Sequence, residues 1–149
     1  DEESLISDIV NRERGSGRRV SEIRRELGET MDRYVAVFRD REGIQEAHEI
    51  VRRLKEEAQT AYIDDRSSIF NQDVLGALEL GYMLDCAECA CVGALERTES
   101  RGAQYRTDFP DRNDDDWLKH IDLKMNGEGP EISYSDVTIT EWQPMERTY

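Results

Sequence analysis

Two stretches of the chain place apolar residues three or four positions apart, the spacing of one buried face of an α-helix. The first stripe consists of Val20, Ile23, Leu27, Met31, Tyr34, Val37 and Phe38. The second consists of Ile44, Ala47, Val51, Leu54, Ala58 and Tyr62. Residues 39–43 separate the stripes, and Glu, Arg and Lys fill the outer face of the second. The pattern predicts two amphipathic helices joined by a turn.

Residues 74–95 are apolar on nearly every side and carry charges only at Glu79, Asp85 and Glu88. A helix without a polar face is expected to lie between other elements. Its length would also suit a membrane span, but each acid would cost roughly 2.5–3.5 kcal/mol at the centre of a bilayer. We therefore predict the central helix of a bundle in water.

The two ends of the chain have different patterns. Residues 3–11 predict a short helix, which the Arg14-Gly15-Ser16-Gly17 turn ends. After a polar loop at 64–70 and the central helix, residues 111–116 predict a charged loop. Residues 117–125 and 132–140 predict two strands, and 126–130 has strong turn chemistry. A lone hairpin is marginal in water, so we expect it to pack on a helix or a partner.

These elements predict a mainly α fold: a three-helix bundle, spectrin-repeat-like in arrangement, with an extended C-terminal tail containing a β-hairpin. The predicted sections are a connection at 1–17, the bundle at 18–110 and the tail with the hairpin at 111–149.

The chain has 149 residues and a formal net charge of −14, which argues against nonspecific binding to nucleic acid or anionic membranes. It starts at Asp1 without a signal-peptide pattern, so we expect a processed product or an excised piece. All three cysteines lie within six residues, unlike the framework of a secreted disulfide scaffold. The pattern favours a reducing, cytoplasmic-side environment.

Cys86, Cys89 and Cys91 would supply thiolates for zinc or an iron–sulfur cluster, but no fourth ligand lies nearby. On a helix, Cys91 would also point roughly 200° away from Cys89. We therefore favour core packing for the cysteines. For His48 and His120 we favour structural roles, because neither has the spacing of a catalytic triad.

The three acids of the central helix are either catalytic carboxylates or salt-bridge partners of the flanking helices, and we favour the second role. The basic residues available as partners are Arg24, Arg25, Arg52 and Arg53.

Three arginines stand close together in the segment RTESRGAQYRTDFP, residues 97–110. Arg97 and Arg101 are four apart and would share the last turn of the central helix, where cations suit the helix dipole and Gly102 would close it as C′. An arginine fork suits a dicarboxylate or a cofactor phosphate. The alternative is that the arginines cap the helix and pair with Glu96, Glu99 or a neighbouring domain, and spacing alone favours that structural role.

The segment RTESRGAQYRTDFPDRNDDDWLKH closely resembles the end of the flavoprotein subunit of succinate dehydrogenase and fumarate reductase. SEIRRELGETMDRYVAVFRDREGIQEA resembles the first bundle helix of that family, and ALELGYMLDCAECACVGALERTES its long third helix. The closing PMERTY is also similar, so the resemblance runs from about Val20 to Tyr149. Gln104 departs from the family pattern, which usually has His there, and a catalytic role at this position is therefore doubtful.

The resemblance implies that the intact chain binds FAD, usually covalently through a His, and oxidises succinate to fumarate. Hydride passes to the flavin, an Arg shuttles the proton, and electrons pass to an iron–sulfur subunit and then to quinone. The residues for that chemistry lie upstream, so no catalytic, cofactor-binding or metal residue, and no FAD, is expected in this piece. Residues 1–17 would connect to the flavin-binding domain.

The resemblance further implies contacts with the flavin-binding domain of the same chain and with the iron–sulfur subunit, and indirectly with membrane-anchor subunits. It places the complex at the cytoplasmic face of the inner membrane. A homodimer of the isolated domain stays open. The residues expected to contact another domain or partner are Arg97, Glu99, Ser100, Arg101, Tyr105 and Arg106.

Four alternatives remain. Fumarate reductase and L-aspartate oxidase share the flavoprotein plan. A free-standing acidic helical interaction module and a small Cys-metal protein belong to other classes.

Overall fold

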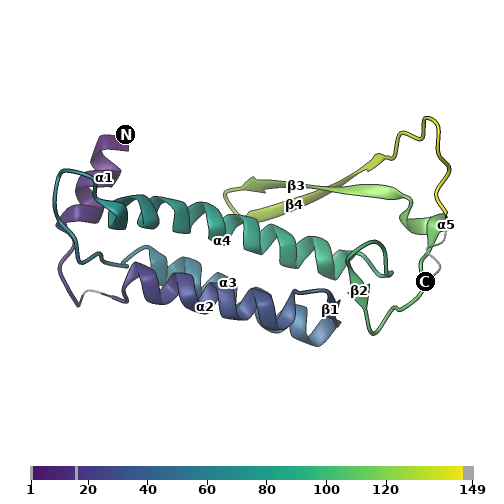
Figure 1. Ribbon diagram of the computed structural model, residues 1–149, viewed down its shortest axis with the longest axis horizontal. Helices are drawn as coiled ribbons and strands as arrows, with labels where there is room; N and C mark the ends of the chain where they lie inside the picture. Colours follow the sequence, from purple (N-terminus) through teal and green to yellow (C-terminus); the bar gives the residue numbers. More distant parts are fainter. Residues whose placement is uncertain (1, 16, 146–149) are drawn as a thin grey trace.

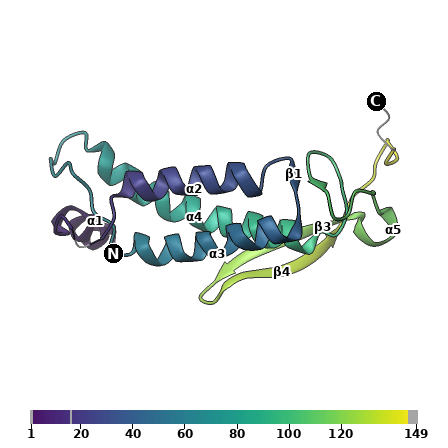
Figure 2. The ribbon, with the colours of Figure 1, turned by 90° about the horizontal axis from the view of Figure 1, so that it is seen from below.

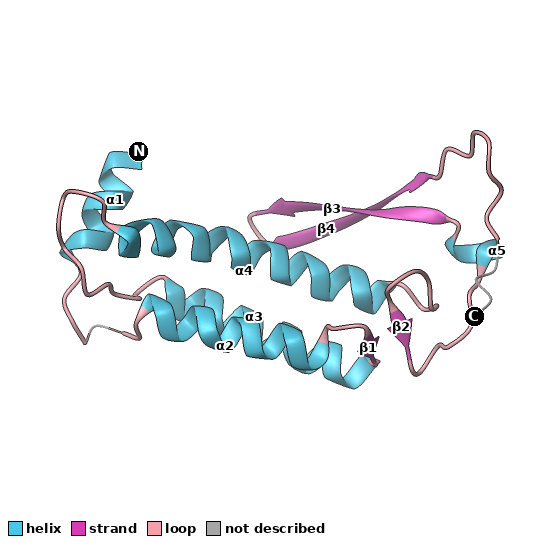
Figure 3. Ribbon diagram, in the orientation of Figure 1, coloured by secondary structure: helices cyan, strands magenta, loops and turns pink. Residues whose placement is uncertain are grey.

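The computed structural model describes residues 2–15 and 17–145. Three long helices run up, down and up side by side, and a two-stranded hairpin lies along the third (Figures 1 and 3). The helices are α2 (Val20–Tyr34), α3 (Arg41–Ala58) and α4 (Gln72–Glu96). The predicted mainly α bundle with a C-terminal hairpin is confirmed. The closing residues 146–149 of the family-like ending lie outside the described residues.

The core of the bundle is built from the two predicted stripes. The buried apolar side chains that α2 and α3 contribute are Val20, Ile23, Leu27, Ile44, Ala47, Val51 and Leu54. The stripes end earlier than predicted, because α2 stops at Tyr34 and α3 at Ala58. Val37 and Phe38 lie beyond the end of α2 and are 50% and 71% exposed, so their assignment to the buried face is wrong.

The connection between α2 and α3 is more ordered than the predicted turn. It contains the two-residue strand β1 (Phe38–Arg39), and α3 begins at Arg41. Asp40 caps α3, since its Oδ1 accepts a hydrogen bond of 2.8 Å from the N–H of Gly43. The predicted turn is therefore a short strand followed by the capped start of α3.

Helix α4 begins at Gln72, where the side chain of Asn71 accepts a hydrogen bond from the N–H of Val74 at 3.0 Å. It packs on α2, α3 and both strands of the hairpin, which explains its apolar surface (Figure 2). Its central position was predicted. No helix in the described part of the chain has the length and apolar character needed to cross a membrane.

The acids on α4 form salt bridges, as predicted, but with partly different partners. Glu79 pairs with Arg24 at 3.2 Å. Asp85 and Glu88 both pair with Lys55 of α3, each at 2.7 Å, rather than with an arginine. Lysine reaches these acids because its amine lies on the face of α3 that packs against α4.

A short helix, α1 (Glu2–Asn11), precedes the bundle and packs on α4 through the buried Ile9. The predicted break follows it, with Gly15 at a φ of +88°, a conformation suited to glycine. Ser16 of that break lies outside the described residues.

The hairpin consists of β3 (Lys119–Asn126) and β4 (Gly129–Asp136), paired antiparallel. Strand β4 begins and ends earlier than the predicted 132–140. Strand β3 begins later and ends one residue later than the predicted 117–125, and Trp117 belongs instead to the short helix α5 (Asp114–Trp117). The turn is stabilised by Asn126, whose Oδ1 accepts from the N–H of Glu128 at 2.8 Å and of Gly129 at 3.1 Å. The hairpin packs along α4, as expected for a hairpin that needs a partner.

A pair of parallel strands was missed by the sequence analysis. Strand β2 (Tyr105–Arg106) lies beside β1 at the end of the bundle away from α1 (Figures 1 and 2). The N–H of Tyr105 donates to the carbonyl of Val37, and that of Thr107 to the carbonyl of Arg39, both at 2.9 Å. This pair joins the segment after α4 to the connection between α2 and α3.

Core packing predicts the effect of truncating Leu54 of α3, which is fully buried. We expect Leu54→Ala to lower the free energy of unfolding by about 2–5 kcal/mol, because it removes apolar contacts and leaves a cavity. Leu75→Ala is the matched control, since Leu75 is also helical but 48% exposed, and should cost less than about 1 kcal/mol. Urea unfolding measures both, and equal losses would contradict the assigned core.

Candidate functional site

The segment after α4 folds back over the end of the bundle instead of continuing the helix. Helix α4 ends at Glu96, and Arg97 is its C-cap residue. Arg97 and Arg101 therefore do not share a helical turn, and that prediction is wrong. Gly102 has a φ of +60°, but in the turn closed by hydrogen bonds between Arg101 and Gln104 at 2.9 and 3.1 Å, not at the C′ position of the helix.

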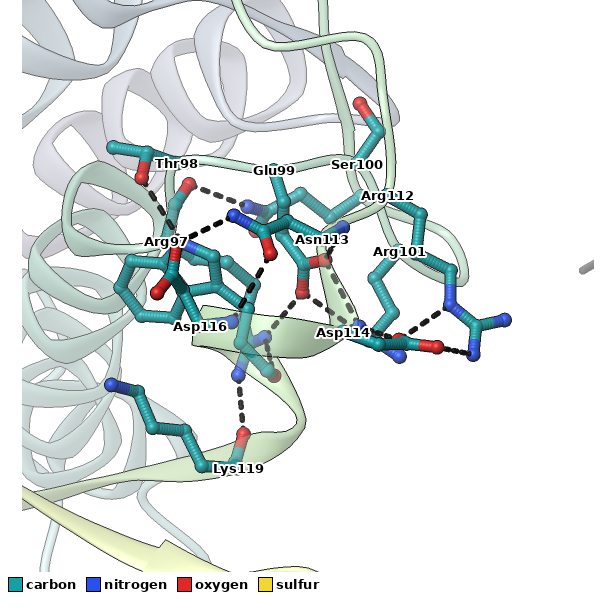
Figure 4. A network of polar contacts seen from close by, with 12 residues as sticks. Arg97, Thr98, Glu99, Ser100, Arg101, Arg112, Asn113, Asp114, Asp116 and Lys119 are labelled. Carbon is teal, nitrogen blue, oxygen red and sulfur yellow. Dashed lines mark hydrogen bonds and ion pairs between the residues drawn. The ribbon is translucent and has the colours of Figure 1, made fainter. Parts of the chain in front are cut away.

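Glu99 brings the two arginines together by a different route (Figure 4). Its carboxylate is completely buried and accepts from Nη1 of Arg97 at 2.6 Å. Arg101 donates from Nε at 2.6 Å and from Nη2 at 3.0 Å. The N–H of Asn113 donates at 2.8 Å. The buried charge is thus compensated by two cations and a backbone donor, as burial requires.

Arg97 extends this contact to the hairpin. Its guanidinium donates to the carbonyl oxygens of Trp117 at 2.9 Å and Lys119 at 2.7 Å. It also stacks over the ring of Trp117, 5.2 Å from the centroid. Trp117 in turn donates from Nε1 to the hydroxyl of Thr98 at 3.1 Å. These bonds fix the start of β3 against the end of α4.

Arg106 is also completely buried and serves the end of α4. Its Nη1 donates to the carbonyl oxygens of Ala94 at 2.7 Å and Arg97 at 3.0 Å. Helix ends leave such carbonyls without partners and favour a cation there. Its other nitrogens bind both oxygens of Asp108 at 2.8 and 2.7 Å, and Asp108 also accepts from the N–H of Arg41 at 3.2 Å.

Of the remaining predicted site residues, Ser100 is part of this structure and Tyr105 lies at its edge. The Ser100 hydroxyl accepts from the N–H of Arg106 at 2.9 Å and donates to the carbonyl of Phe109 at 2.8 Å. Tyr105 is 40% exposed and packs edge-to-face on Phe38, with ring centroids 5.4 Å apart. Its contact is therefore with the strand pair and not with Glu99.

The pKa of Glu99 follows from its partners. Burial raises the pKa of this carboxyl. The hydrogen bonds from Arg101, the Asn113 N–H and Arg97 lower the pKa by more than burial raises it, so the pKa lies below the ordinary 4.5. Glu99 is ionised at neutral pH, and its charge strengthens the contact.

Three residues that donate or accept hydrogen bonds in this region were not predicted as site residues. Asn113 and Asp114 lie in the stretch predicted as a charged loop, and Asp108 lies in the arginine segment but was not among the predicted contact residues. Asp114 pairs with Arg101 at 2.6 Å and with Arg112 at 2.5 Å, and these arginines, Arg112 first, lower the pKa of Asp114 to about 2. The available signal was Asn113 three residues before Asp116, a capping spacing.

The cysteines have three different environments. Cys91 is buried, Cys89 is half-buried and Cys86 is exposed, so core packing is correct for Cys91 and wrong for Cys86. Burial raises the pKa of the Cys91 thiol to about 11, which keeps it protonated at neutral pH. Within the described residues, no three His, Cys, Asp or Glu side chains are grouped to hold a metal ion.

The two histidines lie apart. His48 on α3 is half-buried, with Nε2 3.6 Å from Glu88, and His120 in β3 is exposed. Their predicted structural role stays a prediction.

We name the set Arg97, Glu99, Arg101 and Arg106 the arginine clamp. The guanidinium groups of its three arginines donate to acceptors within the chain. These internal contacts explain the cluster of arginines without a bound substrate. The clamp connects α4, the strand pair and the hairpin. Contact with a further domain, expected from the sequence, stays a prediction.

A helical bundle whose long third helix is bound through this clamp to a C-terminal hairpin matches known proteins closely. The family described as fumarate reductase flavoprotein C-term matches residues 24–149. The fumarate reductase flavoprotein subunit of Haemophilus influenzae is 44% identical over 130 residues, which are 87% of this chain and 22% of that protein. The succinate dehydrogenase flavoprotein subunit of Rickettsia conorii is 38% identical over 122 residues, 81% of this chain and 20% of that protein.

The solved structure of Escherichia coli quinol fumarate reductase superposes with a TM-score of 0.87 and 35% identity, over 97% of this chain and 25% of that chain. The class is thus a helical C-terminal domain of a flavoprotein. The chain belongs to the C-terminal family of the fumarate reductase and succinate dehydrogenase flavoprotein subunits. It spans 20–25% of the length of these relatives.

Neutralising the buried acid tests the clamp. Glu99→Gln keeps the shape but leaves two partly buried arginines without their carboxylate, so we expect a loss of about 3 kcal/mol in the free energy of unfolding at pH 7. Glu29→Gln is the control, because Glu29 forms an exposed pair with Arg25 at 3.9 Å and should contribute less than about 1 kcal/mol. Urea unfolding measures both variants, and a neutral Glu99→Gln would contradict the clamp.

The stabilisation that Glu99 provides depends on pH, and the Glu99→Gln variant serves to measure it. The folded-state pKa of Glu99 is lowered, so its stabilisation is present above about pH 4.5 and is lost as the pH falls through the folded-state pKa. The difference in unfolding free energy between the parent protein and Glu99→Gln should therefore shrink below pH 4.5. A difference that stays constant from pH 7 to pH 3 would show that the Glu99 charge does not stabilise the fold.

Proposed function

We propose that this chain is the assembly domain of a FAD-dependent flavoprotein that interconverts succinate and fumarate. The residues that carry out the reaction lie in the rest of the polypeptide. This domain packs against that part with a rigid surface. Family membership of residues 24–149 supports the class of enzyme. The arginine clamp supports the structural role, since its cations are committed to acceptors within the chain.

The observation that carries the structural role is the complete burial of Glu99 and Arg106. A substrate-binding arginine must present its donors to an open site. In this chain Arg106 donates to α4 carbonyls and to Asp108, and Arg101 donates to Glu99 and Asp114. The clamp therefore does not fit the pyrophosphate of FAD or a dicarboxylate, and the domain is proposed to contribute no catalytic residue.

The family resemblance names succinate oxidation first and fumarate reduction as its alternative, and we retain succinate oxidation as the first candidate. Fumarate reduction is the second candidate, since the fumarate reductase subunit of Haemophilus influenzae is 44% identical to this chain. The identities do not separate the two directions, because the Escherichia coli fumarate reductase subunit is 36% identical and the succinate dehydrogenase subunit of Rickettsia conorii 38%. The two directions share the flavin and the substrate pair, so the domain serves both equally.

The proposed partners follow from the same family. The solved relatives include a quinol fumarate reductase described with menaquinol molecules. Quinols are lipid-soluble, so we propose that the intact protein passes electrons through an iron–sulfur subunit and lies peripherally on anchor subunits at the cytoplasmic face of the inner membrane.

The test uses the intact gene product. A flavin absorbance that bleaches with succinate and recovers with an electron-accepting dye is the expected result for oxidation. Comparing the rate of succinate oxidation with that of fumarate reduction by a reduced dye then separates the two directions. A colourless product without either activity would refute the proposed function.

The assembly role predicts the effect of Arg101→Ala in the intact protein. Loss of the bonds to Glu99 and Asp114 should weaken the clamp by about 3 kcal/mol and reduce flavin retention or subunit assembly. Flavin content per chain after gel filtration measures this, with Arg25→Ala as the control, since the ion pair of Arg25 within the described residues is an exposed one with Glu29. Normal flavin content and assembly with abolished turnover would instead assign Arg101 to catalysis.

A further inference from the structure

An apolar cavity of about 470 Å³ lies between α1, α3 and α4, at the end of the bundle away from the arginine clamp (Figure 1). Its floor is nearly closed to solvent, because Ile9 of α1 and Leu80 and Leu84 of α4 are at most 4% exposed. Leu5 and Tyr82 also line the cavity and are exposed, so it opens to the surface beside them. Its volume lies within the range of about 300–1,000 Å³ that small-molecule sites occupy. We name it the α1 cavity.

Gly81 leaves room in the α1 cavity on the side of α4. It lies in the interior of that helix and lines the cavity. A Cβ atom at this position would meet no other atom within 4 Å. Glycine is unfavourable inside a helix relative to alanine, and alanine would fit here. The glycine therefore weakens the helix at a point where no side chain of the described residues fills the space.

One of the charged side chains that line the α1 cavity has no opposite charge beside it. The ammonium of Lys55 binds the carboxylate of Asp85 at 2.7 Å, which compensates both charges. Arg12 forms no ion pair with a described residue. Its Nη1 donates to the carbonyl oxygen of Ala61 at 2.9 Å, and no contact of its Nε or Nη2 occurs within the described part of the chain. Arg66 adds positive charge nearby, since its Nη2 donates to the carbonyl oxygen of Arg12 at 2.5 Å. This end of the cavity therefore favours an anion, and the planar guanidinium suits a carboxylate.

The shape of the α1 cavity indicates a chain-like ligand. Along α4 its lining runs from Ala77 to Asp85, about 12 Å of helix. Arg12 contacts the carbonyl oxygen of Ala58 at 3.4 Å, and Ala58 is the last residue of α3. Lys55 lies about one helical turn before Ala58, so the compensated ion pair and the uncompensated arginine stand at different points along the cavity. An alkyl chain that carries one carboxylate fits this combination of an elongated apolar floor and a single unpaired cation.

We propose that the α1 cavity binds a medium-chain fatty acid. The alkyl chain lies over Ile9, Leu80 and Leu84, and the carboxylate accepts charge-assisted hydrogen bonds from Nε and Nη2 of Arg12. Each methylene group that leaves water strengthens binding about threefold to fourfold. The bound chain contacts α1 and α4 together, so it also holds α1 on the bundle.

Photo-labelling of the full-length protein tests the site. The probe is decanoate with a photoreactive diazirine on its chain, and mass spectrometry identifies the labelled peptides. We expect saturable labelling within residues 5–12 or 77–85, which unlabelled decanoate suppresses. Labelling that is confined to other segments, or that neither saturates nor responds to decanoate, would overturn the proposal.

Filling the cavity from α4 provides a matched pair of variants. Gly81→Leu places a side chain in the space beside the apolar floor and should reduce labelling at least tenfold. Gly76→Leu is the control, because Gly76 lies on the same helix outside the cavity lining, and a Cβ there also meets no atom within 4 Å. Leucine favours a helix more than glycine, so both variants should fold. Equal labelling of the two variants would contradict the assigned cavity.

The carboxylate is tested with the same probe by competition. Decanol has the same chain without the charge and should compete at least tenfold more weakly than decanoate. Octanoate, two methylene groups shorter, should compete about tenfold more weakly. Arg12→Gln should weaken decanoate binding about tenfold, with Arg14→Gln as the control, since Arg14 pairs with Asp64 outside the cavity lining. Decanol that competes as well as decanoate, or unchanged binding in Arg12→Gln, would refute the fatty-acid assignment.

None of these readouts uses the flavin or turnover, so the fatty-acid site and the proposed function are tested independently. A colourless, inactive full-length product refutes the proposed function alone. A yellow, active product whose α1 cavity is not labelled refutes only the fatty-acid site.

Discussion

The carboxylate of Glu99, buried without exposure to solvent, is the group on which the arrangement of the C-terminal third depends. A buried charge is tolerated only where donors surround it, and Arg97, Arg101 and the Asn113 N–H supply them. Each donor comes from a different part of the segment that follows α4. Satisfying one charge therefore fixes the path of the chain from the end of α4 to the start of the hairpin.

Arg106 adds a second constraint at the same end of the bundle. By donating to the carbonyls of Ala94 and Arg97 it satisfies the end of α4, and it binds Asp108, which accepts from the N–H of Arg41 at the start of α3. Apolar packing of α2, α3 and α4 forms the bundle, and the buried ion pairs orient the segment after α4 and the hairpin. Buried ion pairs contribute less to net stability than to a defined geometry, which suits a domain that presents a surface to a partner.

Family membership and the clamp lead to one functional picture. The domain belongs to a flavoprotein family, yet the polar groups of its clamp are committed to its own backbone and acids. Under the proposed function, a domain of this kind contributes to activity by keeping another part in place.

The apolar spacing by itself determined the three helices, their buried faces and the central place of α4, because these depend on which residues must avoid water. The hairpin was also predictable from its strand-forming residues and turn chemistry, within a few positions. The strand pair β1–β2 and the convergence of Arg97 and Arg101 on Glu99 were decided by tertiary structure alone. The strand pair joins residues 68 positions apart, such as Arg39 and Thr107, and no local pattern encodes which buried donor will meet which acceptor.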